Sequence, residues 1–257
     1  MKIITSELLE MSYDELIEYF IKKNGQPKYD YFHTQECRSV HEKNSRTKEG
    51  LEIHHIDENK YDNLSGKWAK KFPYECQKAN RLVYVNVLEH FLLHIKIYQE
   101  DSVKRIDAKK HPEMGKPGIY FLTRRINGYF SIKSFDSWHD NMARIIKRNF
   151  SEYILELTYF LTVFSKYYPD RLLAYIYFVA LKEDGTYYNR VINHLHKTCV
   201  DILPTKVGDK IEHHEYGIGV VTEVNLLTRS CYYFNVMFDG KGLKNVSSND
   251  NFKIIRT

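Results

Sequence analysis

The sequence contains no paired cysteine motif, no long apolar run and no low-complexity tract. Its four cysteines are never spaced as C-x-x-C, which gives a structural zinc knuckle little support. They are Cys37, Cys76, Cys199 and Cys231. No stretch reaches the roughly 18 apolar residues that a membrane span needs, and we expect no targeting leader. We therefore expect a cytoplasmic protein with reduced thiols and no membrane partner.

Strong charge of one sign is also missing. The 38 basic and 33 acidic residues leave a net charge of +5, which is compatible with a polyanionic partner but does not identify one. The chain has 257 residues, of which 43% are hydrophobic. It is therefore long enough for two or three small domains and apolar enough to form a core.

The first hundred residues alternate between periodic and polar segments. Residues 6–23 have the apolar spacing of an amphipathic helix, which is interrupted at Met11-Ser12 and stopped by Gly25-Gln-Pro27. Further along, the pattern predicts a strand, a polar connection, a returning strand and a helix. These four segments are residues 51–56, 57–80, 82–85 and 87–98.

The rest of the chain changes character twice. Residues 99–117 are charged and broken by prolines, which indicates a linker, and residues 118–203 are mainly helical in pattern. The apolar segments within that region lie around 136–150, 151–167 and 170–182. Short β-type runs follow at 207–211, 219–224, 231–238 and 252–255, which predicts a small β-barrel. The expected class is α+β, with domains at 1–100, 101–204 and 205–257.

Four histidines lie where apolar neighbours impose order. His90 and His94 are four residues apart and share one face of the expected helix, so they could hold one ion together. His54 and His55 are adjacent in a strand and point to opposite faces. His54 could therefore complete a three-imidazole site with an open position, which is typical of a catalytic metal. His55 would then be free to act as general base, with a usual pKa of about 6.5.

The segments Glu52-Ile-His-His-Ile56, Leu82-Val-Tyr84 and Glu89-His90-x-x-x-His94 resemble the two strands and the helix of the HNH (ββα-metal) nucleases. The doubled first histidine is most similar to the colicin DNases. The resemblance implies an N-terminal ββα-metal domain that cleaves DNA with one divalent ion, whether Zn, Mg, Mn or Ni. It also implies the ligand and base roles already given to the four histidines.

Several neighbouring residues could support such a site. The asparagine of the family normally comes directly before the returning strand, whereas here Asn80 is followed by Arg81. Either Asn80 braces the loop or Arg81 has replaced it. Glu52 and Glu89 are next to the ligands and could orient imidazoles.

Basic residues near the motif could neutralise phosphate charge, because phosphate contacts dominate nucleic-acid affinity. The candidates are Arg46, Lys48 and Lys96. Solvated surface charge is the alternative interpretation of all three.

The segments from Val207 to Val224 and from Val236 to Lys241 are similar to the Tudor-like (SH3-like) domain at the C-terminus of some DNA-repair helicases. The resemblance implies a small barrel that binds a protein partner or nucleic acid without carrying out catalysis.

We therefore interpret the chain as a metal-dependent HNH endonuclease that hydrolyses DNA phosphodiester bonds in restriction, phage defence or a mobile element. RNA is left open as a target, and a homodimer would suit double-strand cleavage. The alternative is a catalytically inactive DNA- or protein-binding protein with a structural zinc. A third interpretation makes the barrel an adaptor for a repair or replication enzyme.

Overall fold

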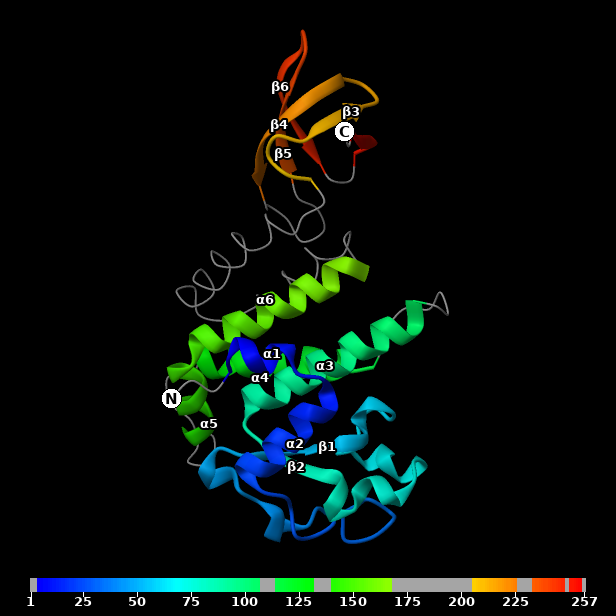
Figure 1. The fold of residues 1–257 in the computed structure, drawn as a ribbon, viewed down its shortest axis with the longest axis vertical. Helices are drawn as coiled ribbons and strands as arrows, with labels where there is room; N and C mark the ends of the chain where they lie inside the picture. Colours follow the sequence, from blue (N-terminus) through cyan, green and yellow to red (C-terminus); the bar gives the residue numbers. More distant parts are fainter. Residues whose placement is uncertain are drawn as a thin grey trace. The chain divides into compact units, whose positions relative to one another are not determined.

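The computed structural model describes residues 4–106, 114–131, 140–167, 205–225, 233–247 and 250–255. The chain divides into two compact units, Met1–Tyr159 and Phe160–Thr257, and it combines helices with strands, as expected for an α+β protein (Figure 1). Within the described ranges, no helix has the length and apolar character that crossing a membrane requires.

Two helices open the first unit, α1 (Ser6–Glu10) and α2 (Tyr13–Asn24). Ser12 caps α2, because its hydroxyl accepts the Glu15 N–H while the Glu15 carboxylate accepts the Ser12 N–H at 2.8 Å. Gly25 ends the helix at a φ of 81°. The break and the end of the predicted helix are therefore confirmed.

A two-stranded hairpin and a long helix follow. β1 (Glu52–His55) pairs antiparallel with β2 (Leu82–Val85), and α3 (Val87–Ile106) begins directly after it. This is the predicted order of strand, connection, strand and helix. α3 continues past residue 98 into the stretch expected to be a linker, and its Ser102 is fully buried there.

The polar connections around this hairpin are short 3-10 turns. They are η1 (Glu42–Asn44), η2 (Thr47–Glu49), η3 (Ile56–Asn59), η4 (Lys67–Lys71), η5 (Tyr74–Gln77) and η6 (Ala79–Arg81). η3 matters most for the site, because it turns the chain sharply at the end of β1.

Three further helices are α4 (Lys116–Ser131), α5 (Asp140–Arg148) and α6 (Phe150–Tyr167). α4 packs against both α3 and α5. α6 matches the predicted segment 151–167, whereas the segment 170–182 lies outside the described residues.

Glu156, on the part of α6 that belongs to the first unit, is a fully buried carboxyl group. Neither of its oxygens has a hydrogen-bond partner among the described residues. Burial, together with the nearby charges of Glu89 and Glu152, raises the pKa of Glu156 well above its usual value. In the unfolded chain this group ionises at about pH 4.3. Folding stability should therefore fall as the pH rises above that value.

Glu156→Gln is expected to raise the thermal midpoint relative to the wild type, by an amount that increases between about pH 5 and pH 8. Over this range the unfolded wild-type chain is stabilised by ionisation of Glu156, whereas glutamine does not ionise. Thermal unfolding followed by circular dichroism at several pH values measures the difference between the two proteins. A difference that stays constant over this range would contradict the expectation.

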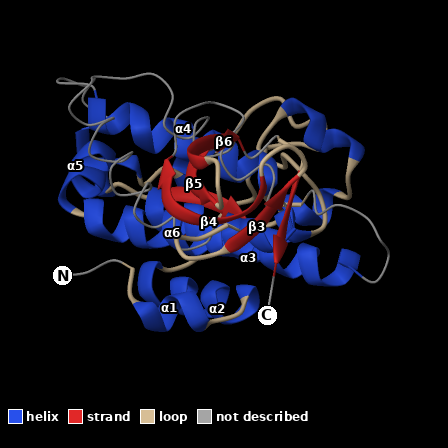
Figure 2. Ribbon diagram, turned by 90° about the horizontal axis from the view of Figure 1, so that it is seen from above, coloured by secondary structure: helices blue, strands red, loops and turns tan. Residues whose placement is uncertain are grey.

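The second unit contains a five-stranded antiparallel sheet in the order β6-β5-β4-β3-β7. The strands are β3 (Lys210–His213), β4 (Gly217–Asn225), β5 (Tyr233–Phe238), β6 (Gly242–Ser247) and β7 (Phe252–Ile255). β7 returns to pair with β3, and Figure 2 shows β4 and β5 as strongly curved ribbons. β6 was not predicted, because its sequence GLKNVS has only two apolar side chains.

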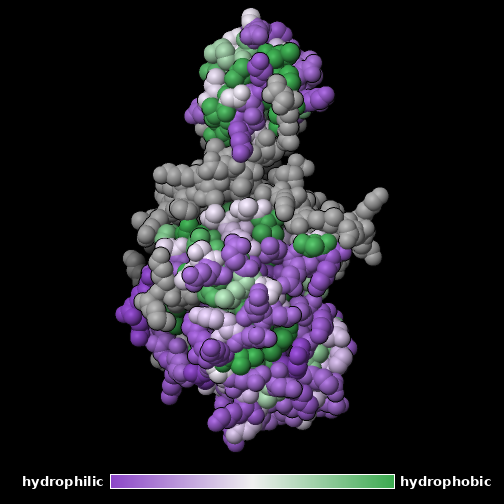
Figure 3. Space-filling view, viewed as in Figure 1, coloured by the Kyte–Doolittle hydropathy of each residue, from purple (hydrophilic) through white to green (hydrophobic). Residues whose placement is uncertain are grey.

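The outer face of this sheet carries apolar side chains. Val220, Met237 and Leu243 lie opposite one another on adjacent strands and are 39%, 47% and 54% exposed. Figure 3 shows apolar surface on this unit, whereas the visible face of the first unit is mostly hydrophilic.

Candidate metal centre

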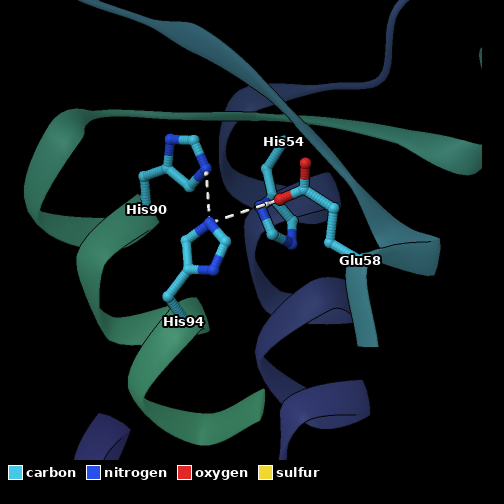
Figure 4. A group of neighbouring side chains, drawn as sticks. All are labelled: His54, Glu58, His90 and His94. Atoms are coloured by element: carbon cyan, nitrogen blue, oxygen red, sulfur yellow. Dashed lines mark hydrogen bonds and ion pairs between the residues drawn. The ribbon is translucent and has the colours of Figure 1, made fainter. Parts of the chain in front are cut away.

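Four side chains of the first unit converge where β1, η3 and α3 meet (Figure 4). They are His54, Glu58, His90 and His94, and each offers one ligand atom within 4.8 Å of the others. The hairpin and the helix thus bring together the three histidines that the sequence analysis selected as ligands. Glu58 is an addition that the sequence analysis missed.

The spacing of these atoms matches a metal site. His94 Nε2 lies 3.2 Å from both His90 Nε2 and Glu58 Oε2, and Glu58 Oε2 lies 3.5 Å from His54 Nδ1. Tetrahedral zinc bonds of about 2.0–2.1 Å place neighbouring ligand atoms roughly 3.3–3.4 Å apart. Three imidazole nitrogens and one carboxylate oxygen suit zinc or nickel better than magnesium, which prefers an all-oxygen shell. The four residues could therefore hold one divalent ion.

A buried tyrosine sets the protonation of His54. Tyr13 donates its hydroxyl hydrogen to the Ile56 carbonyl at 2.8 Å, so the same oxygen can only accept from His54 Nε2, also at 2.8 Å. The proton of neutral His54 therefore lies on Nε2, and its Nδ1 lone pair faces the cluster. That Nδ1 is buried and makes no hydrogen bond among the described residues, as expected for a ligand atom.

His90 is held by a carboxylate. Its Nδ1 donates to Glu52 Oε1 at 2.6 Å, and the other carboxylate oxygen of Glu52 accepts from Arg125 of α4. Burial opposes ionisation, but His90 and Arg125 lower the pKa of Glu52 to about 2. Such a carboxylate fixes the orientation of a metal-binding imidazole and leaves Nε2 as the ligand atom. Glu52 thus lies where an orienting role requires it, and Arg125 is a partner that the sequence analysis missed.

His94 is fixed by close packing. A Cβ atom at Gly118 of α4 would lie 2.2 Å from the His94 ring, so only glycine allows this approach. Burial lowers the pKa of His54 and of His94, against the opposing charge of Glu58. Both imidazoles are therefore neutral near pH 7, which is the form that binds metals.

Glu58 supplies the negative charge of the cluster. Burial opposes its ionisation, but the hydrogen bond from His94 and the charge of His54 hold the pKa of Glu58 well below its usual value. Its position four residues after His54 would be informative in a helix, whereas here the chain passes from a strand into a 3-10 turn. The sequence pattern therefore gave no signal for it.

His55 lies on the opposite face of β1 from His54, as strand alternation requires, but it does not face water. Its side chain is 1% exposed, packs edge-on against Tyr31 and lies 3.0 Å from Gln77 through Nε2. Its Nδ1 lies 4.0 Å from Glu58 Oε1. The expectation that His55 faces a substrate or water is therefore replaced by an interior position behind Glu58.

The two candidates for bracing the loop differ in their contacts. Arg81 binds Asp57 of η3 through two hydrogen bonds, at 2.7 Å and 2.5 Å. Asn80 is exposed. It is therefore Arg81 that ties the end of the connection to the turn that carries Glu58.

Glu89 supports the fold rather than an imidazole. Its carboxylate accepts the Asn86 N–H at 2.8 Å, and the Asn86 side chain accepts the Glu89 N–H in return. Glu89 also binds Lys23 of α2 at 2.5 Å. Glu89 therefore caps the N-terminus of α3 and links α2 to α3 through an ion pair. In this way it positions the histidines indirectly.

The three phosphate-contact candidates are placed differently. Lys96 is 4% exposed and donates to Tyr159, so its ammonium is not offered to a phosphate. Arg46 pairs with Glu49 at 2.7 Å. Lys48 is exposed and lines a second pocket, which shares no lining residue with the pocket beside the metal cluster.

A pocket of about 320 Å³ opens beside the cluster. Its lining includes Glu58, His90 and His94 on one side, and the first turns of α4 on the other. Phe121 contributes an aromatic ring that is 62% exposed. Among the described residues, the lining contains no lysine or arginine, and His55 does not reach it.

No family model, curated protein or solved structure matches this chain. The function is therefore inferred from the cluster and its pocket.

Proposed function

We propose that this protein is a metal-dependent endonuclease of the HNH type that hydrolyses DNA phosphodiester bonds. The observation that carries the proposal is the convergence of His54, His90, His94 and Glu58 within 4.8 Å, on a hairpin followed by a helix. The adjacent pocket of about 320 Å³ gives a substrate access to two of the imidazoles.

A divalent ion held by His54, His90 and His94 would supply a Lewis acid for the phosphate and the leaving oxygen. Glu58 lines the pocket as an ionised carboxylate and is placed to accept a proton from an attacking water. His55 lies behind it, with Nδ1 4.0 Å from Glu58 Oε1, and could take the proton onward. The general-base role expected of His55 thus becomes indirect, with Glu58 between it and the pocket.

We also propose that the C-terminal sheet is an SH3/Tudor-like barrel that binds a protein or nucleic acid. The support is its strand order, in which the last strand pairs beside the first. The proposed setting of restriction, phage defence or a mobile element depends on analogy with other proteins of this organisation.

One observation favours a second candidate, a binding protein with a structural zinc. If Glu58 is a ligand, the four groups complete a tetrahedral site and leave no open position. The apolar row of Val220, Met237 and Leu243 would then suit an adaptor.

A plasmid cleavage assay tests the proposal directly. We expect the full chain to nick supercoiled DNA when Zn, Mg, Mn or Ni is added, and chelation to stop the reaction. His90→Ala should abolish nicking, whereas His214→Ala replaces an exposed histidine of the other unit and should not. Tight stoichiometric zinc without cleavage under any of these ions would favour the binding protein instead.

A further inference from the structure

A second pocket lies on the first unit, between η2 and α5. It has a volume of about 510 Å³. Its lining residues are Lys48, Glu49, Asn141, Arg144, Ile145, Arg148 and Asn149. Three of these seven are cations, and only one is an acid.

The cations of this pocket have no acidic partner within the part of the chain that the structure describes. Glu49, the one acid, is already bound by Arg46. Arg144 and Arg148 are four residues apart on one helix face, where like charges repel. The C-terminus of α5 favours a cation at Arg148, but this explanation does not extend to Arg144 or Lys48. Positive charge therefore converges here without a counter-ion from the described residues.

The two walls of the pocket are fixed to each other. The Asn141 side chain donates to the Lys48 carbonyl. Gly50 has a φ of 77°, and a Cβ atom there would lie 2.4 Å from Ile145 Cδ1. The positive φ favours glycine at this position, and the absence of a side chain lets Ile145 of α5 pack directly against the turn. The concave basic surface is therefore formed by the fold itself before a ligand binds.

The same scaffold supports the metal cluster. The turn that carries Lys48 leads directly into β1, where Glu52 holds His90. Arg125, which binds Glu52, also contacts Met142 of α5, with 3.8 Å between Nη2 and Sδ. A nuclease must neutralise the phosphates next to the scissile bond, and the described lining of the metal pocket provides no cation for this.

We propose that this basic pocket binds phosphate groups of the DNA strand whose scissile bond lies at the metal cluster. The identification of the polyanion as DNA rests on the proposed function. Arginine side chains can contact phosphate through two parallel hydrogen bonds, which positions the strand without reading its sequence.

The test measures binding separately from cleavage. A fluorescein-labelled DNA duplex is titrated with the full chain in a chelating buffer, and fluorescence anisotropy gives the affinity at several salt concentrations. The double variant Arg144→Gln with Arg148→Gln should bind more weakly. Its plot of log affinity against log salt should be shallower by about 2, roughly one for each lost phosphate contact.

Two variants serve as controls. Arg144→Lys with Arg148→Lys keeps both charges and should retain most of the affinity. Lys147→Gln removes a charge from the exposed side of the same helix, outside the pocket, and should have little effect. Thermal unfolding confirms that each variant is folded under the conditions of the binding assay.

Three outcomes would overturn the proposal. They are a wild-type chain that does not bind the duplex, an unchanged affinity and salt slope in the double glutamine variant, and an equal loss in Lys147→Gln. The proposed nuclease activity can fail independently of this test. If the plasmid stays intact while the double variant still loses binding, DNA binding by the basic pocket is supported and the proposed nuclease activity is not.

Discussion

His94→Ala is expected to weaken the binding of a divalent ion at least about 100-fold, because even partners of metal ligands are typically worth 10- to 100-fold in affinity. His94 Nε2 lies 3.2 Å from atoms of both His90 and Glu58, so its removal opens one side of the cluster. Competition with a chromophoric chelator gives the zinc affinity, and metal analysis after dialysis gives the stoichiometry.

His214→Ala is the matched control, because it removes an exposed imidazole of the C-terminal unit. The wild type should hold one ion per chain, and this control should hold the same. Tyr13→Phe removes the hydroxyl that sets the proton on His54, so it should bind with an intermediate affinity. Equal affinities in wild type and His94→Ala would show that the cluster is not a metal site.

Glu58→Gln is expected to slow plasmid nicking by about 10²- to 10⁴-fold, the usual range for losing a group that accepts the proton. The glutamine keeps the shape of the side chain but cannot take a proton. The three histidines remain, so the loss of metal affinity should be smaller than in His94→Ala. Nicking rates and zinc affinities measured on the same protein preparations separate the two effects.

Two further variants sharpen this comparison. His55→Ala should also slow nicking while metal is retained. The His55 ring approaches the cluster at Glu58, which is not one of the three predicted histidine ligands. Glu18→Gln changes an exposed carboxylate of α2 and should match the wild type. If Glu58→Gln loses metal as severely as His94→Ala does, Glu58 is a ligand, and a structural zinc becomes the better interpretation.

Local patterns were sufficient to predict the scaffold of the site. The break at Met11-Ser12 and the stop at Gly25 are short-range signals, and the structure has both. The strand at 82–85 and the start of the following helix were also predicted correctly. The spacing of His90 and His94 was enough to place them on one helix face, because helical periodicity is a property of the backbone.

Contacts between distant segments could not be predicted in this way. Arg125 reaches Glu52 across 73 positions of sequence, and Tyr13 reaches His54 across 41. Neither pair has a periodic signature, because the packing of separate helices on the hairpin decides which side chains meet. Glu58 could not be predicted either, because the direction of its side chain depends on the 3-10 turn that follows β1. The pattern of hydrophobic residues does not predict the path of this turn.

His55 shows most clearly the difference between what the sequence determines and what the tertiary structure decides. Strand alternation in the sequence determined that it points away from His54 and the other ligands. Only the tertiary structure decided what lies on that side, where Tyr31 and Gln77 cover the ring and leave it 1% exposed. The sequence thus determined the elements and the directions of side chains along each one, because these follow from local backbone geometry. The tertiary structure decided which side chains are buried, paired or open to a substrate, because these depend on segments that are brought together only by packing.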